Sequence, residues 1–402
     1  MSKNIPEVRF EGFSEDWSPI NLSELMDFSN GINAPKESYG KGRKMISVMD
    51  ILDESYLKYE NIRSSVEVSP SIEEKNKVEY GDLIFVRSSE VSEEVGWSKA
   101  YLEKEYALYS GFSIRGKKKG SFNSSFVELS LNYTNRKQIE RKAGGSTRFN
   151  ISQTILNTIE ILKASYEEQQ KIGDFFKQLD VMIALQQQLV KQQQQYKKAM
   201  LQKMFPQKGE RVPKVRFAGF IEDWKKGQLE NFLVEYIEKT TIENEYTLLS
   251  STNNGIEERN GRVSGLSNIG YKIIRKGNMV LSPQNLWLGN INYNSEYEIG
   301  IVSPSYKTFN IIQSDNYFIS TYLRLPIMLK KYAQSSLQGA SIVRRNLDMD
   351  LFNQITIFIP SQKEQQKIGA FFKQLDDTIA LHEKKLEDYR QLKKTLLQRM
   401  FV

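Results

Sequence analysis

The chain contains no cysteine and only one histidine, His382, among its 402 residues. Disulfides, thiolate nucleophiles, zinc clusters and histidine-based catalytic triads are therefore excluded. No apolar run approaches the roughly 18 residues that a membrane span requires. The N-terminal stretch MSKNIPEVRF lacks the hydrophobic region of a signal peptide. We therefore expect a cytoplasmic protein with no membrane contact.

Motifs for nucleotide and methyl-transfer chemistry are also missing. The sequence has no GxxxxGK(S/T) phosphate loop and no convincing GxGxxG after a strand. None of its ten prolines forms a proline pair or precedes aspartate. This excludes the paired-proline signature of amino-methyltransferases and the Pro-Asp start of a common nuclease motif. We expect a chain that is not an enzyme and that binds no metal or cofactor itself.

The chain has the composition of a globular protein and an excess of basic residues. Hydrophobic residues make up 39% and charged residues 26%, which is typical of a folded protein rather than a disordered one. Its length suits two or three domains. The formal charge of +7 favours a polyanionic partner, but only weakly, because many proteins of this size carry a similar excess.

An internal repeat dominates the sequence. The stretch 168–185 (EQQKIGDFFKQLDVMIAL) returns 196 positions later as 364–381, and KKAMLQKMF at 197–205 returns as KKTLLQRMF at 393–401. Near the start of each half, EVRFEGFSEDW at 7–17 matches KVRFAGFIEDW at 214–224. The blocks between these flanks, 20–150 and 227–346, share little. This layout predicts a fixed scaffold that holds two interchangeable binding domains.

Each copy of the repeat predicts a long helix with an apolar stripe at heptad spacing. About 40 residues in a helix form a rod of roughly 60 Å, which needs a partner along its length. We expect the two copies to pair with each other as an antiparallel coiled coil; the alternative is that each packs only on its own block. Polar residues interrupt both stripes and would set the register: Gln186, Gln193, His382 and Lys385. The predicted stripes are Ile172, Phe175, Leu179, Met182, Leu189, Tyr196 and Met200, and then Ile368, Phe371, Leu375, Tyr389, Leu392 and Leu396.

The variable blocks predict short strands and helices, and the fold class is therefore α+β. We expect two mixed α/β domains joined by the two long antiparallel helices, with an internal pseudo-twofold. The predicted domains are 1–160 and 206–360, and the predicted helices are 161–205 and 361–402. The bridge FPQKGERVPKVRF at 205–217 resembles both chain ends, which predicts a circular organisation. The N-terminal segment should then dock near the end of the second helix.

Each block also carries loops that combine cations, hydroxyls, amides and glycines. Lysine and arginine neutralise DNA phosphates, and arginine, asparagine and glutamine can pair with base edges. Taken singly, each loop could equally be a solvated turn. Arg148 and Arg344 stand out because they hold equivalent places in loops that otherwise differ. The candidate DNA-binding residues are Arg87, Ser88, Ser89, Lys117, Lys118, Lys119, Thr147, Arg148, Gln284, Asn285, Trp287, Ser305, Tyr306, Lys307, Arg344 and Arg345.

These motifs, in this order, resemble the DNA-specificity subunit of type I restriction-modification systems. Two variable domains are each introduced by VRFxGFxxDW and each end in EQQKIGxFFKQLD followed by KKxxLQxMF. The resemblance implies that each variable block is a target-recognition domain that reads one half of a split, asymmetric sequence in double-stranded DNA. It implies that the paired helices fix the spacer between the two half-sites.

The resemblance also implies partners for this chain. Two methyltransferase subunits would dock on the helices, bind S-adenosylmethionine and methylate adenine. Restriction subunits that translocate DNA would use ATP, with Mg²⁺, and cleave DNA. None of these cofactors would be bound by this chain, which would only direct the other subunits to their target.

Two other functions fit parts of the same pattern. The chain could be the specificity part of a restriction-methylation enzyme outside type I, which its neighbouring genes would reveal. It could also be a coiled-coil adaptor that binds proteins. The salt dependence of binding would distinguish the adaptor from a DNA-binding protein. DNA binding through several phosphates weakens steeply between about 50 and 200 mM salt.

Overall fold

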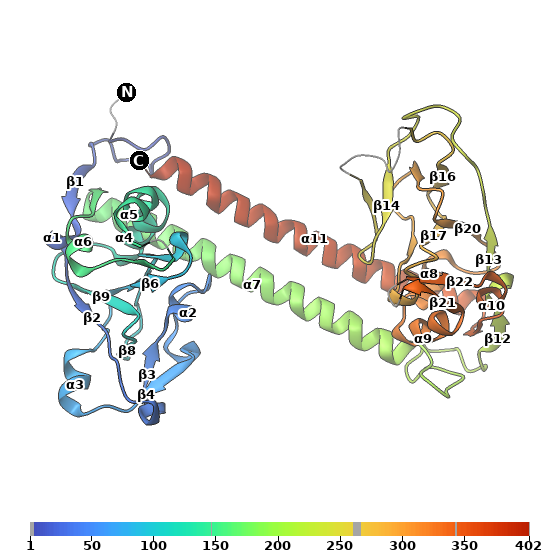
Figure 1. Cartoon of the computed structure of the whole chain (residues 1–402), viewed down its shortest axis with the longest axis horizontal. Coiled ribbons are helices and arrows are strands. Elements are labelled where there is room, and N and C mark those ends of the chain that lie inside the picture. Colours follow the sequence, from blue (N-terminus) through green and yellow to red (C-terminus); the bar gives the residue numbers. More distant parts are fainter. Residues whose placement is uncertain (1–3, 146, 260–266, 342–343, 402) are drawn as a thin grey trace. The chain divides into compact units, whose positions relative to one another are not determined.

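The computed structural model describes residues 4–145, 147–259, 267–341 and 344–401, and only the backbone of 337–341 and 344–345. Its contacts group the chain into two compact units, Met1–Leu189 with Glu383–Val402, and Val190–His382. Each unit contains one variable block and parts of both long helices (Figure 1). We call the blocks lobe 1 (residues 18–163) and lobe 2 (residues 225–359). The domain boundaries predicted at residues 160, 205 and 360 stay a prediction.

The two repeated segments form the two longest helices of the described chain, α7 (Tyr166–Met204) and α11 (Gln362–Met400), of 39 residues each. Helix-favouring Gln, Lys, Leu and Ala fill both, and neither contains proline. Each begins after a serine, Ser165 or Ser361, whose carbonyl accepts the first helical N–H bonds. Pro206 follows shortly after the end of α7, where it cannot continue a helix. The predicted long helices are confirmed.

The stripe that each helix buries lies partly one residue away from the predicted one. In both helices one set of buried and half-buried positions follows a four-three spacing, and the two sets are 196 positions apart. Met182, Tyr196 and Leu392 are exposed by 44%, 47% and 46%, so their assignment to the stripe was wrong. Phe175, Leu189 and Phe371 are half-buried beside the stripe rather than in it. Lys385 is exposed too, whereas His382 is half-buried as expected. The observed stripes are Ile172, Phe176, Leu179, Ile183, Gln186, Val190, Gln193, Lys197, Met200 and Met204, and then Ile368, Phe372, Leu375, Ile379, His382, Leu386, Tyr389, Lys393, Leu396 and Met400.

Reciprocal ion pairs show that the helices run in opposite directions. In the first unit, Lys393 near the end of α11 donates to Asp180 in the first half of α7 at 2.6 Å. In the second unit, Lys197 near the end of α7 pairs with Asp376 in the first half of α11. The two pairs are equivalent under the repeat, since each partner lies 196 positions from its counterpart. The predicted antiparallel pairing is confirmed within each unit (Figure 1).

Each lobe is built around a four-stranded antiparallel sheet, and the two sheets have the same strand order. Lobe 1 has the order β2-β9-β5-β7, and lobe 2 the order β13-β20-β17-β18. Strands β5 and β17 hold the same place in their sheets, and they lie in two similar stretches, YGDLIFVRS at 80–88 and KGNMVLSPQ at 276–284. The strands are β2 (Met26–Asn30), β9 (Ser113–Lys118), β5 (Leu83–Val86) and β7 (Ser98–Ala100), and β13 (Leu233–Glu235), β20 (Lys307–Ile311), β17 (Met279–Leu281) and β18 (Ile291–Tyr293).

Shorter strand pairs complete the lobes. In each lobe the first strand pairs with the last, so the lobe closes just before its long helix begins: β1 (Ser18–Asn21) with β11 (Glu160–Lys163), and β12 (Lys225–Gln228) with β23 (Thr356–Ile359). The others are β3 (Tyr39–Ile46) with β4 (Ser64–Val66) and β8 (Leu108–Tyr109), β6 (Ser88–Ser89) with β10 (Phe149–Asn150), β14 (Leu249–Ser251) with β15 (Ile256–Glu258), β16 (Lys272–Arg275) with β19 (Ile299–Val302), and β21 (Ser336–Ser341) with β22 (Arg344–Leu347).

Short helices cover the sheets. Those that pack beside the long helices are α4 (Ser124–Leu129) in lobe 1 and α8 (Asn316–Leu323) in lobe 2. The others are α1 (Leu22–Leu25), α2 (Val48–Ile51), α3 (Pro70–Lys75), α5 (Arg136–Lys142), α6 (Gln153–Asn157), α9 (Pro326–Gln334) and α10 (Met349–Asn353). The predicted mixture of strands and helices is confirmed. Among the described residues, no helix is long and apolar enough to cross a membrane.

The repeated motif EQQKIG fixes each lobe to its helix. Glu168, whose side chain is 1% exposed, accepts bonds from Arg9 Nε at 2.9 Å, Arg9 Nη2 at 2.8 Å and Trp17 Nε1 at 3.1 Å. Gln169 Oε1 accepts from the backbone N–H of Asn123, the residue whose side chain caps α4. A Cβ on Gly173 would overlap the same Asn123 side chain. The repeated Glu168, Gln169 and Gly173 thus each have a packing reason.

The second copy of the motif makes the same contacts in the second unit. Glu364 accepts from Arg216 Nε at 2.8 Å and Nη2 at 2.7 Å. Gln365 Oε1 accepts from the backbone N–H of Asp315, which caps α8. One difference is Trp224, whose buried Nε1 has no hydrogen-bond partner among the described residues, whereas Trp17 donates to Glu168.

The circular organisation predicted from the chain ends is present. The backbone N–H of Val8 donates to the carbonyl of Arg399 at 2.9 Å, and that of Val215 donates to the carbonyl of Lys203 at 2.9 Å. The N-terminal segment therefore docks at the end of α11 as the bridge docks at the end of α7. Phe401 stacks on Phe126 in the first unit, and Phe205 on Phe318 in the second.

Replacing Glu168 with Gln should destabilise the first unit. The change leaves the largely buried guanidinium of Arg9 without its counter-charge, and we expect a loss of about 3 kcal/mol in the free energy of unfolding. Glu364→Gln should cost less, about 2 kcal/mol, because Trp224 makes no bond to it. Asp377→Asn is the control: it breaks an exposed pair with Lys373 and should cost less than about 0.5 kcal/mol. Equal urea midpoints for all three variants would contradict this account.

Candidate nucleic-acid interface

Lobe 1 brings two of the predicted loops together. Strand β5 ends at Val86, and the chain continues through Arg87 into β6, which pairs with β10 in the GGSTRFN loop. The register places Ser89 opposite Phe149 and Ser88 opposite Asn150, and the Ser88 hydroxyl donates to the Asn150 side chain. Gly145 permits the tight approach, since its φ is +125° and a Cβ there would overlap the Arg148 carbonyl. Arg87, Ser88, Ser89, Thr147 and Arg148 therefore form one cluster.

Two arginines supply the positive charge of this cluster. Arg87 Nη1 donates to the Gly111 carbonyl at 3.3 Å, and the Arg148 guanidinium lies 5.6 Å from the centroid of the Phe112 ring. Within the described part of the chain, neither arginine forms an ion pair with a carboxylate. Thr147 and Arg148 are exposed. Both cations are therefore available to phosphates or base edges.

The lysine triplet lies apart from this cluster. Lys117 and Lys118 are the last two residues of β9, whereas Arg87 lies beside its first residue, roughly 17 Å away along the strand. Lys117 pairs with Glu79 at 3.1 Å and Lys119 with Asp27 at 2.9 Å. Lys118 turns inward to the Phe122 carbonyl at 2.6 Å, and burial lowers its pKa. Nearby carboxylates therefore already neutralise part of the positive charge of the lysine triplet, which the sequence analysis had assigned to DNA binding.

Lobe 2 places its two predicted turns at the same end of its sheet. Leu281, the last residue of β17, lies opposite Lys307, the first residue of β20. Gln284 and Asn285 in the first turn and Ser305 in the second are exposed. Lys307 pairs with Glu235 at 2.7 Å.

The two aromatic candidates of lobe 2 are more enclosed. The Tyr306 hydroxyl donates to the Ser251 carbonyl at 3.2 Å. Trp287 is half-buried in a short 3-10 turn, Leu286–Leu288, that contacts α9.

The remaining candidates of lobe 2 lie in its β21–β22 hairpin. The backbones of Arg344 and Arg345 belong to β22, and their side chains lie outside the described residues. This pairing differs from lobe 1, where the corresponding loop pairs with β6. The same frame therefore carries two differently built loops at equivalent positions.

Two residues of the lobe 1 cluster were missed by the sequence analysis. Phe112 stands in the turn between β8 and β9 with 53% of its surface exposed, and Asn33 is exposed beside the neighbouring Gly111. Phe112 lies in the stretch YALYSGFSIRG at 106–116, where the Ser-Gly pair before it was the available signal of a turn. Its exposure depends on the tertiary structure, which no local pattern reports.

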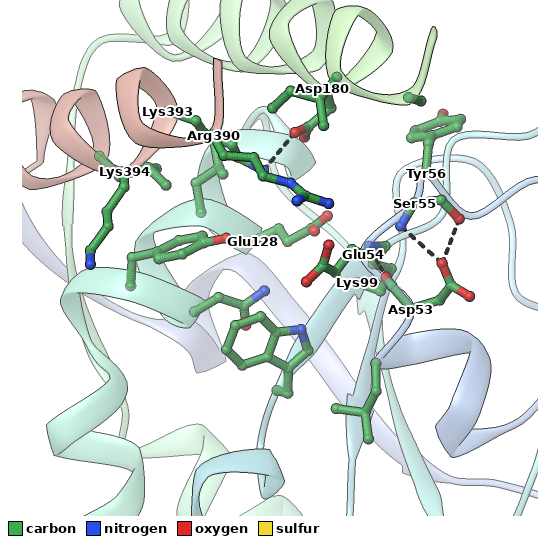
Figure 2. Close-up of a pocket in the computed structure, with 18 of the residues that line it drawn as sticks. Asp53, Glu54, Ser55, Tyr56, Lys99, Glu128, Asp180, Arg390, Lys393 and Lys394 are labelled. Atoms are coloured by element: carbon green, nitrogen blue, oxygen red, sulfur yellow. Dashed lines mark hydrogen bonds and ion pairs between the residues drawn. The ribbon is translucent and has the colours of Figure 1, made fainter. Parts of the chain in front are cut away.

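A separate cavity of about 670 Å³ lies in the first unit between lobe 1 and the two long helices (Figure 2). Its volume suits a ligand pocket. Lys393 and Asp180 pair across one side, Lys99 donates to the Asp53 carbonyl at 2.8 Å, and burial raises the pKa of Glu128. Its carboxylic acids and bases number four each: Asp53, Glu54, Glu128, Asp180, Lys99, Arg390, Lys393 and Lys394. This balanced charge does not suit a phosphate backbone, so the exposed loops are the better candidates for DNA.

The family of the chain follows from its sequence. The model of the type I restriction modification DNA specificity domain matches it twice, at residues 14–193 and 203–388. The chain belongs to this family. It is a DNA sequence-specificity subunit, and the resemblance seen in its repeated motifs is confirmed.

Solved structures share the fold of this specificity subunit. The S subunit of a type I restriction-modification system from M. genitalium is 15% identical, with a TM-score of 0.62 and 99% of each chain covered. A chain from a study of complex assembly and conformational transition of the type I system is 13% identical, with a TM-score of 0.50. It covers 96% of this chain and 97% of that one. The α+β class with paired long helices is thereby confirmed.

Replacing Arg148 with Ala should weaken DNA binding without unfolding lobe 1. The guanidinium is exposed and has no carboxylate partner, so we expect its loss to weaken binding about tenfold. If the guanidinium contacts a phosphate, the slope of the logarithm of the binding constant against the logarithm of the salt concentration should also become smaller by about one. Lys117→Ala is the matched control and should change affinity by about twofold or less, since Glu79 already pairs with it. Fluorescence anisotropy across a salt series measures both. A larger loss for Lys117→Ala would reverse this assignment.

Proposed function

We propose that this specificity subunit reads a bipartite, asymmetric DNA target, with each lobe reading one half-site. The observation that carries the proposal is that the two lobes share their sheets and their attachment to the helices but differ in their loops. Both lobes have the same sheet order and the same attachment to a long helix. Their loops differ in sequence and in strand pairing. Equivalent domains with unlike loops suit two different half-sites.

The antiparallel helices suit a symmetric attachment of these two readers. The bond that ties Asn123 of lobe 1 to Gln169 on α7 recurs in lobe 2 between Asp315 and Gln365 on α11. The helix-to-helix pair of Lys393 with Asp180 likewise recurs as Lys197 with Asp376. We infer that the helical pair fixes the number of unread base pairs between the half-sites. The length of the helices, rather than the lobes, would then set the spacer.

The chain would act without catalysis of its own and direct other subunits to the target. Two methyltransferase subunits, with S-adenosylmethionine, would methylate adenine, and restriction subunits would use ATP and Mg²⁺. The outer face of α7 offers a docking place, because Val181, Met182 and Leu185 are exposed by 48%, 44% and 60%. The related chain from the assembly study supports subunit association in this family.

Exchanging residues 20–150 for the block of another family member tests this proposal. The chimera keeps both helices and lobe 2, so we expect one half-site of the methylated motif to change, while the other half-site and the spacer length stay the same. Mapping methylated adenines in cells that express the chimera with its methyltransferase partner provides the measurement. Changes in both half-sites would contradict independent readers, and a changed spacer would contradict the role of the helices.

A further inference from the structure

The turn between β8 and β9 presents an aromatic side chain to solvent inside the lobe 1 cluster. Phe112 is 53% exposed, although burying a phenylalanine side chain is favourable. Single exposed apolar residues are common on protein surfaces and need no explanation by themselves. The backbone that holds Phe112 and the groups around its ring indicate a functional reason for its exposure.

Hydrogen bonds fix the backbone on both sides of Phe112. The N–H of Gly111 donates to the Ile32 carbonyl at 2.8 Å, and the N–H of Ser113 donates to the Ser110 carbonyl at 2.9 Å. The Phe112 carbonyl itself accepts from the N–H of Arg87 at 2.8 Å. A Cβ on Gly111 would overlap the Asn33 side chain, so the turn also packs tightly. The backbone that carries this exposed ring is therefore rigidly supported, as a recognition residue requires.

The neighbours of the ring limit how it can contact DNA. The Arg148 guanidinium lies 5.6 Å from the ring centroid, close enough for a cation–π contact with the aromatic face. A wedge between two base pairs needs both faces of the ring free. An edge of the ring remains available, and apolar side chains of this kind contact the C5 methyl group of thymine in the major groove.

We propose that Phe112 recognises thymine, through apolar contact with its C5 methyl group, in the half-site that lobe 1 reads. The proposal rests on the proposed function, in which lobe 1 is a DNA reader. Arg87 and Arg148 beside the ring supply the positive charge that attracts the phosphate backbone of DNA or the edge of a guanine. Lobe 2 offers no such contact at its corresponding turn, because the hydroxyl of Tyr306 is bonded to the Ser251 carbonyl.

Deoxyuridine, which lacks only the C5 methyl group, provides the test. Duplexes that contain the mapped target would carry deoxyuridine at one thymine position of the lobe 1 half-site at a time. Wild-type protein should bind one of these duplexes about three- to tenfold more weakly than the unmodified duplex. Phe112→Ala should bind the unmodified duplex more weakly by a similar factor, and the same deoxyuridine should then have no further effect.

Matched variants separate this contact from folding. Phe112→Leu keeps an apolar side chain and should retain part of the sensitivity to deoxyuridine, with an unchanged unfolding midpoint. Tyr306→Phe in lobe 2 should leave that sensitivity as in the wild type. Wild-type binding that ignores every deoxyuridine, or a Phe112→Ala protein that still senses the same one, would overturn the proposal while leaving the DNA-reading function intact. Failure of the wild type to prefer its target over other duplexes would overturn the proposed function instead.

Discussion

The whole molecule depends on the antiparallel pairing of α7 with α11. A 39-residue helix with one apolar stripe cannot bury that stripe alone, and the repeat supplies each helix with a partner of the same heptad spacing. The direction of pairing is held by Asp180 with Lys393 and by its equivalent, Asp376 with Lys197. Because the first half of each helix meets the second half of the other, each lobe is attached to both. Two unlike lobes thereby become equivalent parts of one circular scaffold, which suits a protein that reads two different half-sites.

Much of this fold could be predicted because the repeated residues make equivalent contacts in both units. The long helices, their direction and the docking of the N-terminal segment all followed from it. The register of the stripe did not, because apolar residues occur in adjacent pairs, as at Phe175 and Phe176. In the structure Phe176 faces the buried stripe, whereas Phe175 packs against Phe10 at 5.8 Å. A local sequence pattern cannot show which of two such neighbours lies in the buried stripe. Here the docked N-terminal segment determines it, because Phe175 packs on that segment.

The candidate site was less predictable, for the same kind of reason. Sequence chemistry selected Ser88 and Arg148, and the pairing of β6 with β10 brings their loops together. It also selected Lys117 without showing that Glu79, far along the chain, offsets its charge. Phe112 was missed because its exposure and its contact with Arg148 exist only after folding. Packing explains the repeated Glu168, Gln169 and Gly173, and we propose that the unrepeated turns recognise DNA.

Cross-linking offers the most direct test of the antiparallel pairing, because the chain has no cysteine to interfere. Asp180→Cys with Lys393→Cys places thiols at two positions whose native side chains meet at 2.6 Å and remain partly exposed. A short bifunctional maleimide should join them within one chain, as mass spectrometry of the digested monomer would show. Asp180→Cys with Asp376→Cys, the pair that parallel helices would bring together, should stay unlinked. A link in the second pair and none in the first would contradict the circular, two-reader scaffold.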